Sequence, residues 1–245
     1  MPALLEVEPQ TEQGNWTDFK VFVVEEDAGR YADELKEELG NPEKPDLINE
    51  IDENFNFEDL EIFKKDKIVF IISSFKEKWQ ENAVREIINK SKKNKSKILL
   101  LTLNNPPLEF ENKVYTFKAK EEKQLLTIPK IIIGSLYIRG LVCIDPDDIY
   151  KFLLEKDYGK IDYFSFETYP DKLNQFGDFI NENVSKNITS TFIQIEMSIE
   201  NQFAVADDTI SVIKNVVNPQ YLVYNVWLNK NFKNKKLKVH LITFN

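Results

Sequence analysis

Three apolar runs of strand length constrain the fold of this 245-residue chain more than any other feature. They are FKVFVV (19–24), KIVFIIS (67–73) and KILLLTL (97–103). Each run is nearly continuous in apolar residues, which is typical of strands that are buried on both faces of a parallel sheet. Amphipathic helices are predicted between the runs, over about 29–39 and 77–94. Strands that alternate with helices in this way predict an α/β fold whose sheet is covered on both faces.

The second half of the chain has a different pattern. FIQIEMSI (192–199) alternates Ile193, Ile195, Met197 and Ile199 with polar residues, which is typical of a strand with one face toward solvent. Strand patterns and helix patterns again alternate, so we predict a C-terminal α/β subdomain with a mixed sheet. The other strands are predicted at 161–167, 221–228 and 237–244, and the helices at 128–139, 147–154, 173–184 and 205–217.

The changes of pattern also suggest where the chain divides. Residues 1–18 are polar and acidic and are predicted to form a flexible arm. The first α/β subdomain is predicted over 19–120, a connecting helix region over 121–140, and the C-terminal α/β subdomain over 141–245.

Glycine, cysteine and histidine are scarce, and this excludes several kinds of site. The chain has seven glycines, about 3% of its residues against a typical share of about 7%. No two of them are closer than six positions, so neither a G-x-G-x-x-G nor a G-x-x-x-x-G-K-[ST] motif occurs. The single cysteine, Cys143, rules out an internal disulfide and a cysteine-based zinc site. The single histidine, His240, leaves almost no material for a histidine-rich metal site. We expect no bound cofactor or metal.

Charge and hydropathy narrow the choice of partners and location. The net charge is −9, and only three of the 32 basic residues are arginine. Arginine is favoured for gripping phosphate in a bidentate way, so a nucleic-acid partner is not expected. The start, MPALLEVEPQ, lacks the basic and apolar segments of a signal peptide. The longest apolar stretches fall short of the roughly 20 residues that span a bilayer, so we expect a cytoplasmic protein.

The segment whose residues best fit a catalytic or metal-binding site is Asp145-Pro146-Asp147-Asp148. Its three carboxylates could hold a divalent cation or polarise a water molecule. The same residues also fit the start of a helix, with Asp145 as the N-cap and two acids in the first turn. Both interpretations stay open at this point.

Four other features have simpler interpretations. Asp207-Asp208 fits the start of a helix. Cys143, in an apolar context, is interpreted as a buried inert thiol. His240 alternates with apolar residues in the last strand, so a surface imidazole is expected. The lysines between Lys90 and Lys97 are interpreted as a solvated helix end.

The last hundred residues resemble the FtsZ/tubulin family. GLVCIDPDDI (140–149) resembles the family loop that reads G-L-I-N-x-D-x-x-D-V in the bacterial branch. Gly159-Lys160 opens a strand, and FIQIEMSI falls where the family has its next strand. Residues 206–244 resemble the closing helix, the Asn-Pro turn and the final β-hairpin. The resemblance covers about residues 130–245 and implies an FtsZ/tubulin-like fold with a truncated first subdomain.

The first half departs from the family where the family binds nucleotide. The family has a glycine-rich loop where this chain has 25–29, and a G-G-G-T-G-T-G signature where it has 73–79. Phosphate cradles need bare backbone N–H groups, and each carboxylate about 4 Å from a phosphate would cost roughly 1 to 4 kcal/mol. The family's elements between about 107 and 120 are also shortened. The resemblance therefore implies a degenerate pocket, without GTP binding or GTPase activity, formed by Glu25, Glu26, Asp27, Gly29, Phe75 and Trp79.

The 140–149 loop carries the functional expectation. In the family it reaches the neighbouring subunit's nucleotide, and Asp145 and Asp148 match its two acids, while Cys143 replaces its asparagine. We assign an interaction loop to Cys143, Asp145, Asp147 and Asp148. The resemblance implies a non-enzymatic cytoskeletal or cell-division-related protein. Such a protein would associate with itself, or cap or modulate filaments of a true family member.

Other expectations stay beside this one. No direct membrane contact is expected, because the sequence stops after its last strand, without the tail by which bacterial family members engage membrane anchors. One alternative function is a scaffold or binding module that uses the remodelled pocket near Phe75 and Trp79. The other is a Mg²⁺-dependent carboxylate enzyme at Asp145, Asp147 and Asp148.

Overall fold

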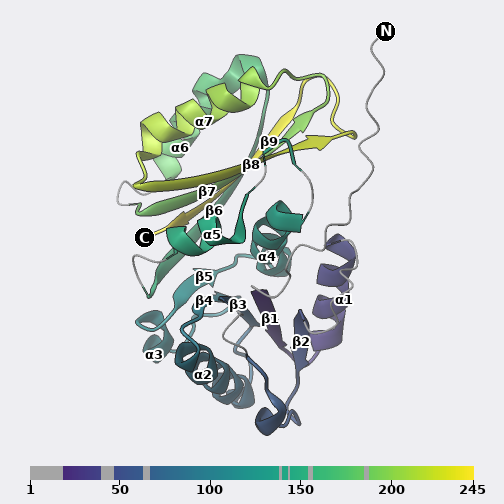
Figure 1. The fold of residues 1–245 in the computed structure, drawn as a ribbon, viewed down its shortest axis with the longest axis vertical. Helices are drawn as coiled ribbons and strands as arrows, with labels where there is room; N and C mark the ends of the chain where they lie inside the picture. The colour runs from purple at the N-terminus through teal and green to yellow at the C-terminus, as the bar shows by residue number, and fades with distance from the viewer. Residues whose placement is uncertain are drawn as a thin grey trace.

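The structure is a computed structural model, and it describes residues 19–39, 47–62, 67–137, 140–142, 144–153, 157–184 and 188–245. The predicted arm at 1–18 and Cys143 lie outside these residues. The chain forms two lobes with α4 and α5 between them (Figure 1). The first lobe contains β1 (Phe19–Val24), α1 (Ala28–Glu38), β2 (Ile48–Ile51), β3 (Ile68–Ser73), α2 (Lys78–Lys93), β4 (Lys97–Thr102), α3 (Leu108–Glu111) and β5 (Tyr115–Lys118). The remaining elements are α4 (Glu122–Tyr137), α5 (Pro146–Phe152), β6 (Gly159–Thr168), α6 (Leu173–Asn183), β7 (Ser190–Ser198), α7 (Ala204–Val217), β8 (Tyr221–Asn229) and β9 (Leu237–Phe244).

The predicted α/β class is confirmed. One mixed sheet runs through both lobes in the order β2-β1-β3-β4-β5-β6-β9-β7-β8, and β1 to β5 are parallel. The three apolar runs form β1, β3 and β4, and every residue in these strands is buried. Val21 and Val23 face a core shared with α1 and α4, whereas Phe22 and Val24 face a core shared with α2. The domain boundaries given above stay a prediction.

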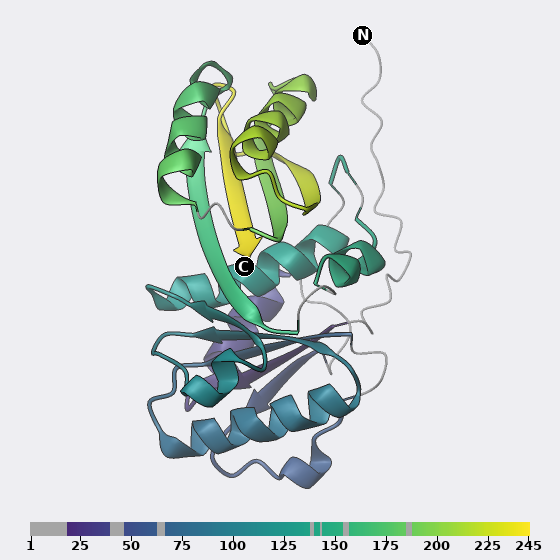
Figure 2. The ribbon, with the colours of Figure 1, turned by 90° about the vertical axis from the view of Figure 1, so that its left-hand side faces the viewer.

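The second lobe has a different strand order from the one implied by its sequence. A final hairpin of β8 and β9 was expected, but β7 lies between them. β7 pairs with β8 in parallel and with β9 in antiparallel orientation, and β9 also pairs with β6. Helices α6 and α7 cover the outer face of this part of the sheet (Figures 1 and 2). Because β8 and β9 are not neighbours, residues 230–236 form a crossing connection between them.

The polar face of β7 is buried, which corrects the expected solvated face, although the same face of the sheet exposes Ser165 and Glu167 on β6. Gln194 and Asn225, neighbours on β7 and β8, are 1% and 0% exposed. Helix α4 covers this face, and the Asn225 side-chain amide donates a hydrogen bond of 2.8 Å to the Ser135 carbonyl of α4. The alternation was read correctly as a strand, but Gln194, in the middle of its polar face, is buried rather than in contact with water.

Three elements differ from expectation because local signals were weak or conflicting. The helix predicted from 128 begins at Glu122 and contains Pro129 inside it. Proline usually marks a helix start or stop, so its sequence position misplaced the boundary. The segment from 107 to 120 contains α3 and β5, which have four residues each and were not predicted.

None of the helices formed by the described residues is long and apolar enough to cross a bilayer.

The two lobes are joined where β5 meets β6. Only two residue pairs connect these strands, Tyr115 with Gly159 and Thr116 with Lys160. A Cβ atom at Gly159 would collide with the Asn245 carbonyl oxygen and would lie 3.0 Å from the Tyr115 ring. The joint therefore needs a residue without a side chain.

We predict that Gly159→Ala lowers the free energy of unfolding by about 1–3 kcal/mol, because backbone at the joint must move. The matched control is Gly29→Ala in α1, where a Cβ would meet only Glu50 Oε2 at an ordinary 3.5 Å. The control should raise stability by about 0.4–1 kcal/mol, since alanine restricts the unfolded chain. Urea unfolding of the variants measures both changes. Equal stability of Gly159→Ala and the wild type would contradict the tight joint.

Candidate functional site

Polar residues that follow β1 and β3 meet at the carboxyl edge of the parallel sheet. The Glu25 carboxylate accepts hydrogen bonds from the Ser74 backbone N–H and, at 2.8 Å, from the Ser74 hydroxyl. The Gln80 side-chain amide donates to Glu25 Oε2 at 3.2 Å. All three side chains are buried, and we call Glu25, Ser74 and Gln80 the edge cluster. It fastens the loop after β1 to the loop after β3.

Gln80 also satisfies the backbone around the start of α2. Its Oε1 accepts from the N–H groups of Lys76 and Glu77 at 2.6 and 2.9 Å. Its Nε2 donates to the Val24 carbonyl at 3.0 Å. Sequence reasoning missed this residue, although a glutamine three positions after the N-cap Glu77 is the pattern of a capping box. The backbone N–H groups of Ser74, Lys76 and Glu77 are therefore already bonded to the side chains of Glu25 and Gln80.

Burial raises the pKa of Glu25 above its ordinary value, although the hydrogen bonds from Ser74 act in the opposite direction. The group is therefore a buried carboxylate whose charge is partly compensated by donors. Such a group takes up the donors that an external anion would need.

The structure places the other predicted pocket residues around this cluster. Phe75 has φ 52°, a left-handed conformation that favours glycine, and its ring stacks on Phe110 with centroids 5.9 Å apart. Trp79 packs against the same core as Phe75. Glu26 and Asp27 are exposed in the turn before α1, and Gly29 lies in the first turn of that helix. The predicted residues thus do gather at one edge, but Glu25 is bonded internally and does not face an open pocket.

The loop before α5 behaves as a helix cap. Asp145 Oδ1 accepts a hydrogen bond of 2.7 Å from the Asp147 N–H, as the capping interpretation predicts. The Asp147 carboxylate lies 2.6 Å from Lys67 Nζ, and Asp148 is exposed. Across the described residues, no three His, Cys, Asp or Glu side chains are grouped so that they could hold a metal ion. Cys143, which was also assigned to the interaction loop, lies outside the described residues.

The edge cluster and α5 lie at opposite ends of β3. Ser74 directly follows the last residue of β3, whereas Lys67, the partner of Asp147, directly precedes its first residue. Six residues of strand span roughly 20 Å. The residues that sequence analysis assigned to a pocket and to an interaction loop are therefore on two separate edges of one sheet.

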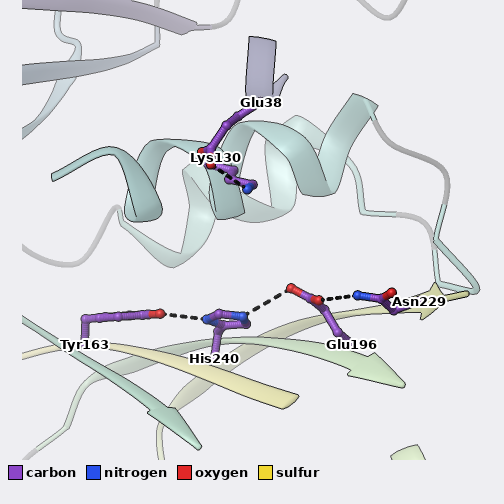
Figure 3. Close-up of polar contacts among 6 residues, drawn as sticks. All are labelled: Glu38, Lys130, Tyr163, Glu196, Asn229 and His240. Carbon is purple, nitrogen blue, oxygen red and sulfur yellow. Dashed lines mark hydrogen bonds and ion pairs between the residues drawn. The ribbon is translucent and has the colours of Figure 1, made fainter. Parts of the chain in front are cut away.

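His240 takes part in a buried network that crosses the second lobe (Figure 3). The Tyr163 hydroxyl lies 2.7 Å from His240 Nδ1, and His240 Nε2 lies 3.2 Å from Glu196 Oε1. The Asn229 amide donates to Glu196 Oε2 at 3.1 Å. Each residue comes from a different strand, in the spatial order β6, β9, β7, β8. The expected surface imidazole is wrong, since His240 is 4% exposed.

The ionisation of this network follows from its burial. Burial lowers the pKa of His240, although the hydrogen bond to Glu196 acts against it, so the imidazole is neutral at pH 7. Its Nε2–H then donates to Glu196, and its Nδ1 accepts from the Tyr163 hydroxyl. Burial also raises the pKa of Tyr163 to about 12, so the phenol keeps its proton. The network has a complete set of donors and acceptors and acts as a cross-strand tie.

Solved structures share this fold, although the sequence matches no established protein-family profile and no curated protein sequence. The empty FtsZ dimer of M. jannaschii matches with a TM-score of 0.61 at 11% identity, over 93% of this chain and 88% of that chain. The GTPγS-bound protofilament of CetZ2 from Haloferax volcanii gives 0.56 at 9% identity, over 93% and 94%. The GTPγS-form protofilament of TubZ from Bacillus thuringiensis serovar israelensis gives 0.56 at 9%, over 93% and 86%. The chain therefore has an FtsZ/tubulin-like fold.

We predict that Asp145→Ala lowers the free energy of unfolding by about 0.5–2 kcal/mol, because the Asp147 N–H loses its cap. Asp145→Asn keeps a capping oxygen but removes the charge, so it should stay within a few tenths of a kcal/mol of the wild type. Thermal melts with and without millimolar Mg²⁺ test the metal alternative at the same time. If Mg²⁺ raises the melting temperature of the wild type and Asp145→Asn is as unstable as Asp145→Ala, the capping interpretation fails.

We also predict a pH effect from Glu25. Its raised pKa means that the folded protein binds the proton more readily than the unfolded chain, so this group's contribution to stability is greatest at low pH. The contribution is fully present below about pH 4.5, the ordinary value, and is lost as the pH rises through the raised pKa. The free energy of unfolding of the wild type relative to Glu25→Gln should therefore fall as the pH rises through that window.

Urea unfolding at a series of pH values measures this difference. The control is Glu26→Gln, which removes an exposed carboxylate one position away. The control should show the same decline relative to Glu25→Gln as the wild type does. A wild-type curve that runs parallel to the Glu25→Gln curve at all pH values would disprove the raised pKa.

Proposed function

We propose that this chain is a non-enzymatic protein of the FtsZ/tubulin-like fold that stacks head to tail without binding GTP. It associates with its own copies or with one end of a filament formed by a GTP-binding relative, as a cap or modulator. The observation that carries the proposal is the edge cluster. In it, the Glu25 carboxylate occupies the Ser74 donors, and Gln80 occupies those of Lys76 and Glu77.

The edge cluster and two aromatic residues beside it oppose nucleotide binding in three ways. A phosphate would have to displace Glu25 from Ser74 and Gln80 from the backbone, and so break bonds in a buried network. The displaced carboxylate would remain nearby, where one pair of like charges at 4 Å costs about 4 kcal/mol at a protein surface. Phe75 and Trp79 add bulk at the same edge, where their rings pack on the second core. Because both rings are engaged in this way, we prefer this function over a remodelled ligand pocket.

Head-to-tail stacking needs two different surfaces at opposite ends of the subunit. This chain has such a pair, since the α5 loop and the edge cluster lie at opposite ends of β3. The similar structures of CetZ2 and TubZ are described as protofilaments, and that of M. jannaschii FtsZ as a dimer. The chain has the loop before α5 at one end of β3 and the edge cluster in place of a nucleotide pocket at the other end. This combination supports a protein that joins a filament but does not hydrolyse GTP at its own pocket.

We predict that the purified protein binds no labelled GTP at micromolar concentration. We also predict that it pellets on sedimentation, either by itself or together with a GTP-loaded FtsZ. Asp148→Lys, on the exposed face of α5, should reduce pelleting severalfold, because a reversed charge opposes docking. The control is Asp208→Lys, an equal charge reversal on α7 in the second lobe, and it should pellet like the wild type.

Each part of the proposal can fail separately. Micromolar GTP binding would refute the closed pocket, whatever the sedimentation result. Absence of pelleting under both conditions would refute stacking. Equal pelleting of Asp148→Lys and the wild type would move the contact away from α5.

A further inference from the structure

A basic cleft opens at the amino edge of the first-lobe sheet, on the same edge as α5. It has a volume of about 470 Å³, which is within the range of small-ligand sites. Lys92 and Lys95 come from the end of α2 and the turn after it, and Lys97 from the start of β4. The lining is completed by Ser96, Ile98, Lys113, Tyr150 and Asp157.

The charge of the cleft is opposite to that of the whole chain. Four lysines and one aspartate line it, so the lining carries three net positive charges, while the chain carries −9. Lys97 is 7% exposed, and its Nζ lies 2.7 Å from Asp157 Oδ1, where the hydrogen bond lowers the pKa of Asp157. Within the ranges that the structure describes, Lys92 and Lys95 form no ion pair, whereas Lys113 Nζ lies 3.7 Å from Glu109 Oε2. The sequence interpretation of a merely solvated helix end therefore omits the concave surface that the fold builds around these lysines.

The kind of cation and the shape of the cleft indicate the ligand. All four cationic side chains are lysines, whose compact ammonium groups bind phosphate as point charges. Arginine, which grips both carboxylate and phosphate in a bidentate way, is not among the residues that line it, so single ammonium–oxygen contacts would hold the ligand. The cleft is confined in volume, and a strongly acidic chain does not offer the broad basic surface that nucleic acid needs. Several positive charges around a small hollow fit a small anion with several charges.

We propose that this cleft binds a small molecule with two or more linked phosphoryl groups. Lys92, Lys95 and Lys113 contact its oxygens, and the ion pair with Asp157 holds the buried Lys97 ammonium group in place. The site is separate from the edge cluster, because it lies at the opposite edge of the sheet. It also does not depend on the proposed stacking function, although a bound anion beside α5 would change the charge of that surface.

The experiment is a calorimetric titration with inorganic pyrophosphate in 0.15 M NaCl, a salt concentration that screens weak surface attraction. The variant Lys92→Gln/Lys95→Asn removes two charges from the cleft. Asparagine is chosen because Lys95 has φ 63°, and asparagine tolerates this conformation. The matched control, Lys230→Gln/Lys233→Asn, removes two exposed lysines from the connection between β8 and β9. Lys113→Gln tests the other wall of the cleft by a substitution on a separate element.

We expect pyrophosphate to bind the wild type and the control alike, and to bind each cleft variant about tenfold more weakly or worse. Absence of binding to the wild type, or equal binding to the wild type and both cleft variants, would overturn the proposal. Citrate is titrated in parallel as a polycarboxylate of similar size. Citrate binding as tight as that of pyrophosphate would overturn the assignment to phosphate.

Discussion

Burial of β1, β3 and β4 on both faces is the constraint on which the rest of this structure depends. Helical crossovers connect these strands, so the strands run parallel with helices on both faces, and all their carboxyl ends lie at one edge. Polar and charged residues of the connecting loops can then gather only at the two edges. One edge holds Glu25, Ser74 and Gln80, and the other holds α5 and the basic cleft. The separation of the two candidate regions follows from strand direction rather than from any property of the loops themselves.

Helix α4 makes the two lobes into one structure. Its apolar residues belong to the same core as β1, β3 and β4, and this core also includes Phe192 and Phe244 of the second lobe. Its further turns cover polar residues of the second lobe, such as Asn225. The Tyr163–His240–Glu196 network lies on the same face of the sheet, below Lys130 of α4, which pairs with Glu38 of α1 (Figure 3). Buried polar groups need partners, and here the strands supply them to each other.

The edge cluster links the fold to the proposed loss of nucleotide binding. A phosphate cradle and a carboxylate cluster both need free N–H groups, such as those that follow β3. Here Glu25 and Gln80 accept hydrogen bonds from the N–H groups of Ser74, Lys76 and Glu77. Phe75 in a left-handed conformation is part of the same arrangement, since it keeps the turn that glycine would make but fills the space with a ring. The opposite edge has kept exposed charge, and both α5 and the lysine cleft lie there.

The sequence by itself determined the α/β class, the three buried strands and most helix positions, because periodicity is a local signal. It left two interpretations of Asp145 open, and the structure shows the capping bond to the Asp147 N–H. The scarcity of glycine in the loops after β1 and β3 led to the hypothesis that they do not bind phosphate. Only the tertiary structure decided that Glu25 is bonded within the protein, that Gln80 completes the cluster, and that His240 is buried under α4. Only the tertiary structure brings Lys113 together with Lys92 and Lys95 in the lining of one cleft. It also places β7 between β8 and β9. Each of these depends on residues far apart in the chain, whose approach is set by packing between elements, and no local pattern of residues records that packing.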